Sequence, residues 1–146
     1  MRITVQMATL AVLSFAAFAA DRNVGTWKLD LAKSKNMGEM TGRVMKISKV
    51  GENKFHYEFE TTTKDGKTTR NTDERVCDGK GHHSVADKSI MYTCAEGHTV
   101  FKRDDKPYLE YIGTYSADGK TFTNVTKTWT KDGQAMPDQI RVYDRQ

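Results

Sequence analysis

The sequence is poor in the features that several common classes of protein require. It has two cysteines and two prolines, no Cys-x-x-Cys pair, and no glycine loop of the kind that binds phosphate. Its 23 basic and 19 acidic residues are interspersed, which argues against nucleic-acid binding, because a nucleic-acid groove needs a basic stripe or patch. Only 37% of the residues are hydrophobic, yet the many aromatic residues and threonines argue against disorder.

One long apolar run is present, and it lies at the start of the chain. Arg2 precedes the run over residues 7–20, which ends in the small-x-small pattern Ala17-Phe18-Ala19. This order is typical of a secretory signal peptide, and the run is short for a membrane helix, which needs about 20 apolar residues. We therefore expect a signal peptide over 1–19, rather than an uncleaved anchor, and one domain over 20–146. The mature protein is expected to be secreted or periplasmic, with no transmembrane segment.

The rest of the chain is predicted to be all-β. Asp-Gly pairs at 65–66, 78–79, 118–119 and 132–133 favour tight hairpin turns, and no segment has sustained helical periodicity. Nine strands are expected, over residues 23–31, 41–50, 54–63, 67–77, 88–94, 98–103, 107–116, 120–130 and 138–144. Short loops predict an antiparallel up-and-down meander. A closed or nearly closed barrel is favoured over a β-sandwich, because closure removes exposed strand edges.

Cys77 and Cys94 are the only cysteines. In an oxidising compartment such a pair forms a disulfide more often than it stays free. A hairpin over 78–93 would place the two residues opposite each other. The alternative is two buried free thiols that act as small hydrophobic residues.

Three short motifs carry a resemblance to a known family. They are Gly25-Thr26-Trp27-Lys28-Leu29 with the Lys-Ser-Lys that follows it, the turn Asp118-Gly119-Lys120-Thr121, and the ending Val142-Tyr143-Asp144-Arg145-Gln146. In this order they resemble a largely uncharacterised group of secreted bacterial lipocalin-like proteins of the calycin type.

The resemblance implies roles for a few residues. Trp27, in the motif that begins at Gly25, would plug the closed end of a barrel. A basic residue of the last strand would stack on its indole, with Arg141 preferred and Arg145 as the second candidate. The chain departs from typical lipocalins because it is shorter, shows no C-terminal helix, and lacks the later motif around the sixth and seventh strands.

Alternating aromatic and apolar residues are predicted to point into the barrel. These candidate ligand-binding residues are Phe55, Tyr57, Phe59, Leu109, Tyr111 and Tyr115. In a barrel of this size, inward side chains either fill the interior or line a cavity for one small ligand. The sequence leaves both interpretations open.

Catalytic and metal-binding groups are weakly represented. His82 and His83, with His98, are the only candidate metal or haem ligands, but adjacent residues of a strand point to opposite faces, and the segment from Asp78 to Asp87 resembles a polar loop. The nearby Ser84 and Asp87 form no recognisable relay with His83. We therefore expect no catalytic residues and no cofactor.

The favoured interpretation is an exported binding protein for an apolar or amphipathic small molecule, without catalysis. The first alternative is a filled barrel that binds a protein or the cell envelope, or inhibits an enzyme. The second alternative is a metal or haem module built on His82 and His83.

Overall fold

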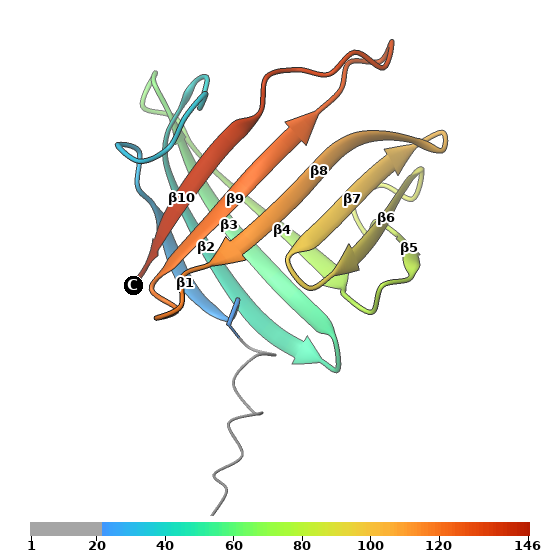
Figure 1. Ribbon diagram of the computed structural model, residues 1–146, viewed down its shortest axis with the longest axis horizontal. Helices are drawn as coiled ribbons and strands as arrows, with labels where there is room; N and C mark the ends of the chain where they lie inside the picture. Colours follow the sequence, from blue (N-terminus) through green and yellow to red (C-terminus); the bar gives the residue numbers. More distant parts are fainter. Residues whose placement is uncertain (1–21) are drawn as a thin grey trace, which may run out of the picture.

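The computed structural model describes residues 22–146, so the predicted signal peptide lies outside the described residues. Ten strands are present (Figure 1): β1 (Gly25–Leu29), β2 (Met40–Gly51), β3 (Lys54–Thr63), β4 (Thr68–Val76), β5 (Gly81–His83), β6 (Ile90–Ala95), β7 (His98–Arg103), β8 (Lys106–Tyr115), β9 (Thr121–Thr128) and β10 (Gln139–Arg145). No helix in this part of the chain has the length and apolar character needed to cross a membrane.

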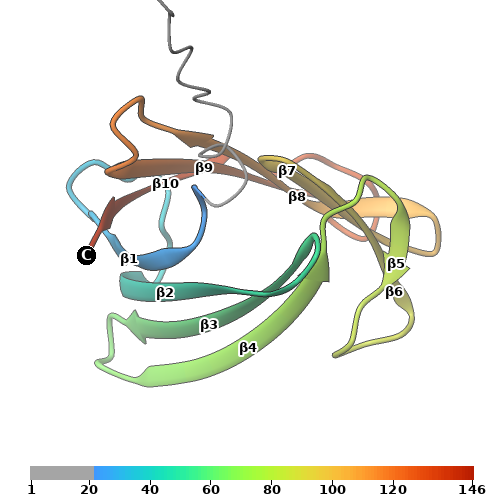
Figure 2. The ribbon, with the colours of Figure 1, turned by 90° about the horizontal axis from the view of Figure 1, so that it is seen from below.

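The strands form one antiparallel sheet that curls into a nearly closed barrel. Their order is β4-β3-β2-β1-β10-β9-β8-β7-β6-β5, so the first and last strands are neighbours in the middle of the sheet. Its two edges, β4 and β5, are not paired with each other, which leaves one seam (Figure 2). The predicted antiparallel barrel is confirmed, and the β-sandwich alternative is wrong.

Nine of the ten strands correspond to the predicted ranges, and β5 is the additional one. Its residues were expected to lie in a polar loop. They form a strand because Gly81, His82 and His83 pair with residues 91–93 of β6. A three-residue strand with two polar side chains carries no hydrophobic alternation, so only its partner strand defines it.

The predicted Asp-Gly turns close the hairpins for two separate reasons. Gly66 and Gly119 adopt φ of 79° and 69°, a left-handed conformation that glycine adopts without steric cost. The preceding aspartates accept backbone hydrogen bonds, as in the 3.0 Å bond from the Lys120 amide to Asp118. A hydrogen bond from the Ser116 hydroxyl, followed by that from the Lys120 amide, lowers the pKa of Asp118. The backbone conformation of the glycine and the carboxylate acceptor of the aspartate therefore both stabilise the same turn.

The core consists of two apolar clusters of unequal size. The larger cluster is built on Trp27 and also contains Leu29, Met45, Ile47, Phe55, Tyr57, Phe122 and Tyr143. The smaller cluster consists of Tyr92, Cys94 and Phe101. Cys77 packs against both clusters, so the two are continuous at that point.

Trp27 is completely buried, but a different arginine from the one expected covers it. The guanidinium of Arg145 lies 4.3 Å from the centre of the indole ring. Arg145 also donates to the carbonyl oxygens of Arg22, Val24 and Gly119. The preference for Arg141 is therefore wrong, because Arg145 pairs directly with Trp27 in the register of β1 and β10.

The predicted disulfide between Cys77 and Cys94 is present. Cys77 directly follows β4, and Cys94 lies in β6, so the bond joins the two sides of the seam. The hydroxyl of Tyr92 in β6 accepts a 2.9 Å hydrogen bond from the Val76 amide of β4. Covalent and polar links thus close the seam at one end.

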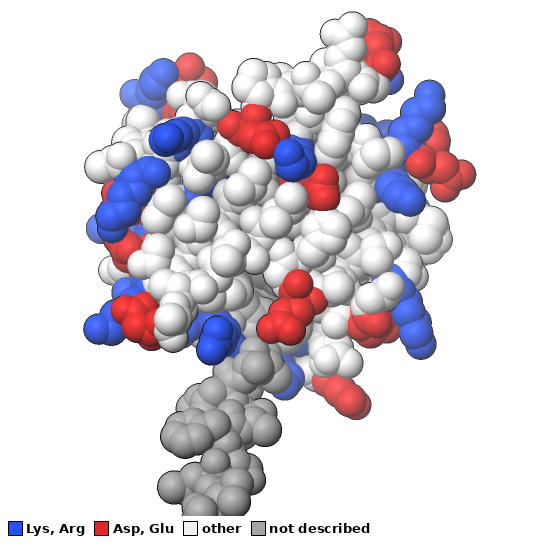
Figure 3. Space-filling model, viewed as in Figure 1, with Lys and Arg blue, Asp and Glu red and all other residues white. Residues whose placement is uncertain are grey.

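Basic and acidic side chains are interspersed on the face of the molecule shown in Figure 3. The face shown in Figure 3 carries lysine, arginine, aspartate and glutamate side by side, with no broad region of one sign. Oppositely charged side chains of neighbouring strands also form ion pairs, such as Lys54 with Glu74, whose charged atoms lie 2.8 Å apart. This face lacks the basic stripe that nucleic acid requires.

Candidate functional site

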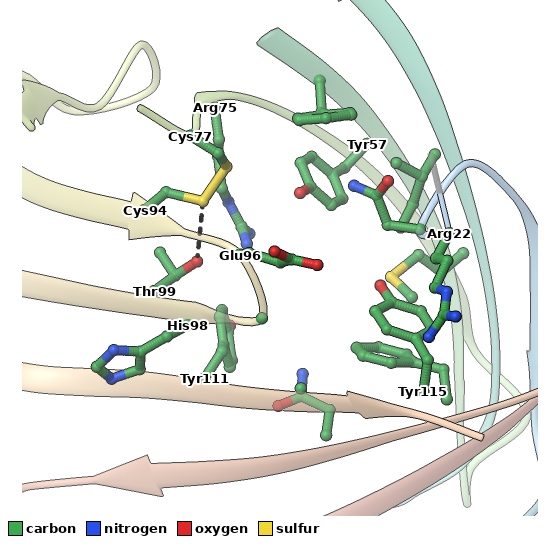
Figure 4. A pocket seen from close by; sticks show the side chains of 18 of the residues that line it. Arg22, Tyr57, Arg75, Cys77, Cys94, Glu96, His98, Thr99, Tyr111 and Tyr115 are labelled. Carbon is green, nitrogen blue, oxygen red and sulfur yellow. Dashed lines mark hydrogen bonds between the residues drawn. A yellow bond between two sulfur atoms is a disulfide. The ribbon is translucent and has the colours of Figure 1, made fainter. Parts of the chain in front are cut away.

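The barrel encloses a cavity of about 280 Å³, just below the range of about 300–1,000 Å³ that is usual for ligand sites. Its walls come from β2, β3, β4, β6, β7, β8, β9 and β10. Figure 4 shows aromatic side chains and the disulfide around this space, with Arg22 and Glu96 among the lining residues. The interior is therefore hollow rather than filled.

Five of the six predicted interior residues line this cavity: Phe55, Tyr57, Phe59, Tyr111 and Tyr115. Leu109 does not. It lines a second hollow of about 280 Å³ in the seam, together with Phe101 and Tyr108. Phe59 and Tyr111 border both spaces, so the second hollow continues the first toward the unpaired edges of the sheet.

Three arginines line the cavity wall although the sequence did not predict any of them there; Arg141 was expected to stack on Trp27 instead. Arg43 comes from β2, Arg75 from β4 and Arg141 from β10. The signal was available, because residues two apart on a strand share a face. Arg43 is two residues from buried Met45, Arg141 is two from buried Tyr143, and each arginine accordingly lies on an inward face.

Arg75 is compensated by its surroundings. The residue is only 8% exposed, and its Nε donates a 2.6 Å hydrogen bond to Asp73. The guanidinium also lies 4.5 Å from the ring centre of Tyr57 and 5.1 Å from that of Phe101. It therefore connects the larger apolar cluster with the smaller one.

Arg43 and Arg141 lack the carboxylate partner that Arg75 has. Within residues 22–146 neither forms an ion pair with a carboxylate, and the Nε atom of each is buried without a hydrogen-bond partner. Arg43 stacks on Phe59, 4.4 Å from the ring centre, and Arg141 donates a 2.7 Å hydrogen bond to the Gln139 side-chain oxygen. Burial, followed by the nearby positive charges of Arg141 and Arg75, lowers the pKa of Arg43.

The tyrosines around the arginines are neutral hydrogen-bonding groups. Burial raises the pKa of Tyr57, Tyr115 and Tyr143 above its ordinary value. Their hydroxyls therefore keep their protons at neutral pH and can donate to a ligand. Asn124, which also lines the cavity, has a buried side-chain oxygen without a partner.

The histidines are not brought together. His82 Nε2 lies 2.9 Å from Asp78, and His83 Nδ1 lies 2.8 Å from the carbonyl oxygen of Lys88. His98 is bonded to Glu110 at 2.6 Å. Among the residues that the structure describes, no three His, Cys, Asp or Glu side chains are arranged to hold a metal ion.

The structure also separates the residues considered for a catalytic relay. Asp87 accepts hydrogen bonds from the amide and the hydroxyl of Ser89. His83 is bonded to a backbone carbonyl instead. These two residues therefore do not form with Ser84 the relay that a hydrolytic triad requires.

Comparisons with known proteins identify the fold. The wild-type fluorescent protein UnaG superimposes with a TM-score of 0.57 at 16% identity, over 86% of this chain and 98% of UnaG. A point mutant of UnaG gives a TM-score of 0.54 at the same identity and covers 97% of that chain. The chain has a calycin-type β-barrel fold.

Other comparisons add little to this assignment. The siderocalin Ex-FABP matches with a TM-score of 0.48 at 14% identity, over 86% of this chain and 74% of that one. No family model matches the sequence. No curated protein matches it either.

Proposed function

We propose that this protein binds a small amphipathic molecule with an anionic head group inside the barrel, and that it catalyses no reaction. The observation that carries the proposal is the pair Arg43 and Arg141, whose buried Nε–H groups lack acceptors. A buried donor without an acceptor costs about 1–3 kcal/mol. An anion would accept from both guanidinium groups through charge-assisted hydrogen bonds, which are stronger than neutral ones.

The aromatic part of the cavity suits the apolar end of such a ligand. Phe55, Tyr57 and Tyr115 line the same space as the arginines. Removing apolar ligand surface from water there contributes about 25 cal/mol per Å². Barrels of comparable strand number are wide enough to hold one small ligand. The ligand would therefore place its charge at the arginines and its apolar part against the rings.

We further propose that the protein works outside the cytoplasm. The pattern of residues 1–19 supports export, and so does the disulfide between Cys77 and Cys94, because such bonds persist mainly in oxidising compartments. Native mass spectrometry of protein recovered from its own host tests this directly. A mass that corresponds to cleavage after Ala19 is expected, whereas the full-chain mass would contradict export with cleavage.

Ligand binding is tested by thermal unfolding with an acid and its uncharged analogue. We expect octanoate to raise the melting temperature in a concentration-dependent way, because a ligand that binds only the folded state stabilises it. Octanol should bind more weakly, because it leaves the arginines unpaired. Equal stabilisation by both would contradict the anionic head group, and no stabilisation by either would contradict binding in the cavity.

A matched pair of variants locates the site. Arg43→Gln and Arg141→Gln are each expected to weaken octanoate binding about tenfold, in line with one lost charge-assisted hydrogen bond. Arg70→Gln is the control, because the Arg70 side chain is 83% exposed and pairs with Glu60 on the outer surface. An equal loss in the control would place binding elsewhere.

A further inference from the structure

The charges around the cavity do not balance. Guanidinium groups reach it from three strands of the wall, in Arg43, Arg75 and Arg141. One of these charges is neutralised, since Arg75 and Asp73 form an ion pair of 2.6 Å. Arg22 and Glu96, which also line the cavity, are both exposed and opposite in charge, so they leave the sum of the lining charges unchanged.

Two positive charges therefore remain, and they belong to nearby strands of the barrel wall. Tyr143 of β10 pairs with Leu29 of β1, and Val44 of β2 pairs with Lys28. Arg43 and Tyr143 thus flank the end of β1, and Arg141 lies two residues farther along β10. Both side chains line the same cavity, and the positive charge of Arg141 contributes to lowering the pKa of Arg43.

A single negative charge would leave this arrangement incomplete. Guanidinium stays protonated in proteins, so one of the two half-buried arginines would remain without a counter-charge, which is unfavourable for a charge partly removed from water. A group with two negative charges neutralises both. A phosphate monoester also offers three acceptor oxygens, enough for both arginine Nε–H groups and a neighbouring tyrosine hydroxyl.

We propose that the head group of the ligand is a compact dianion, such as a phosphate monoester or a dicarboxylate, held between Arg43 and Arg141. This inference rests on the proposed function, because it specifies the charge of the same ligand. It also predicts that ligand affinity follows the second ionisation of the head group. For a phosphate monoester this ionisation has a pKa of about 6.

The test compares the affinities of octyl phosphate and octyl sulfate for the purified full protein by isothermal titration calorimetry between pH 5 and pH 8. Octyl sulfate carries a single negative charge throughout this pH range. At pH 8 we expect octyl phosphate to bind at least tenfold more tightly than octyl sulfate. At pH 5 the two affinities should converge, because the phosphate is then a monoanion.

Octyl sulfate also controls for titration of the protein. The groups that face the head group are the three arginines, Asp73 and the tyrosines Tyr57, Tyr111 and Tyr143. His98 of β7 also lines the cavity, and its Nε2 lies 2.6 Å from Glu110. Any change in the protein itself acts on both ligands and cancels in the ratio of their affinities.

Variants connect the dianion to the two arginines. Arg43→Gln or Arg141→Gln should bring the affinity for octyl phosphate down to that for octyl sulfate and abolish the pH dependence of the ratio. Arg70→Gln should leave the ratio unchanged. If one of the glutamine variants does not fold, the other measures the same loss, because each removes one of the two charges.

Each outcome distinguishes this inference from the proposed function. Equal affinities for octyl phosphate and octyl sulfate at every pH would contradict a dianionic head group but would remain consistent with an anionic ligand. Binding of octanol as tight as that of both anions would overturn the anionic head group. No binding of any of the three would overturn ligand binding in the barrel.

Discussion

The larger apolar cluster contains eight buried residues around Trp27, whereas the smaller one contains only Tyr92, Cys94 and Phe101. The larger cluster is closed by ring packing, for example between Trp27 and Phe122 with ring centres 5.8 Å apart. The smaller cluster is attached to β4 by a disulfide, a hydrogen bond from Val76 to Tyr92, and the stacking of Arg75 on Phe101. The difference shows that the second cluster depends on links across the seam, next to the ligand cavity.

Removing the centre of the larger cluster should have the largest effect. Trp27→Ala deletes a completely buried indole and leaves Arg145 without its ring. We expect a loss of about 3–5 kcal/mol in the free energy of unfolding, measured by urea denaturation. Trp129→Ala is the matched control, because Trp129 is only half-buried, and its cost should be clearly smaller. Similar costs would mean that Trp27 has no special place in the core.

Removing the disulfide should have the second-largest effect on stability, and it should destabilise mainly the smaller cluster. Replacing both Cys77 and Cys94 by serine removes the covalent link across the seam. For a loop of 17 residues the expected loss is about 3 kcal/mol. Hydrogen exchange should increase more in β5 and β6 than in β1 and β2. A uniform increase over the sheet would show that the two clusters unfold as one unit.

The smallest expected effect comes from one hydroxyl at the seam. Tyr92→Phe removes the acceptor of the 2.9 Å bond from the Val76 amide, with an expected loss of about 1 kcal/mol in the free energy of unfolding. Repeating the substitution in the serine double variant measures the coupling between the two links. Additive losses would show that the hydrogen bond and the disulfide act independently.

The sequence was sufficient to predict the strands with strong local signals. Asp-Gly pairs fix turns through backbone conformation and a carboxylate acceptor, both of which are local properties. The alternation of Phe55, Tyr57 and Phe59 correctly placed all three on the cavity side. β5 was missed because its existence depends on pairing with β6, which no property of three polar residues reveals.

The position of the three arginines in the cavity wall could not be predicted, for a different reason. Inward positions on a strand are recognised by alternating apolar side chains. Arg43, Arg75 and Arg141 interrupt that alternation on three strands. Arg75 is the register partner of Phe55, so strand pairing would have placed it inward. The choice between Arg141 and Arg145 as the partner of Trp27 likewise needed the register of β1 with β10. Pairing between distant strands, rather than local pattern, decides which charges are buried.

The neighbouring positions of β1 and β10 impose an order on the assembly of the barrel. β1 is the first described strand to be synthesised, and β10 is the last. One row of β1 backbone groups pairs with β2 soon after β2 is made, but the other row has no partner until residues 143–145 exist. The contacts of Arg145 with Arg22 and Val24 span more than 120 residues of sequence. The cavity, whose wall includes β10, is therefore complete only when residues from both ends of the described chain have come together.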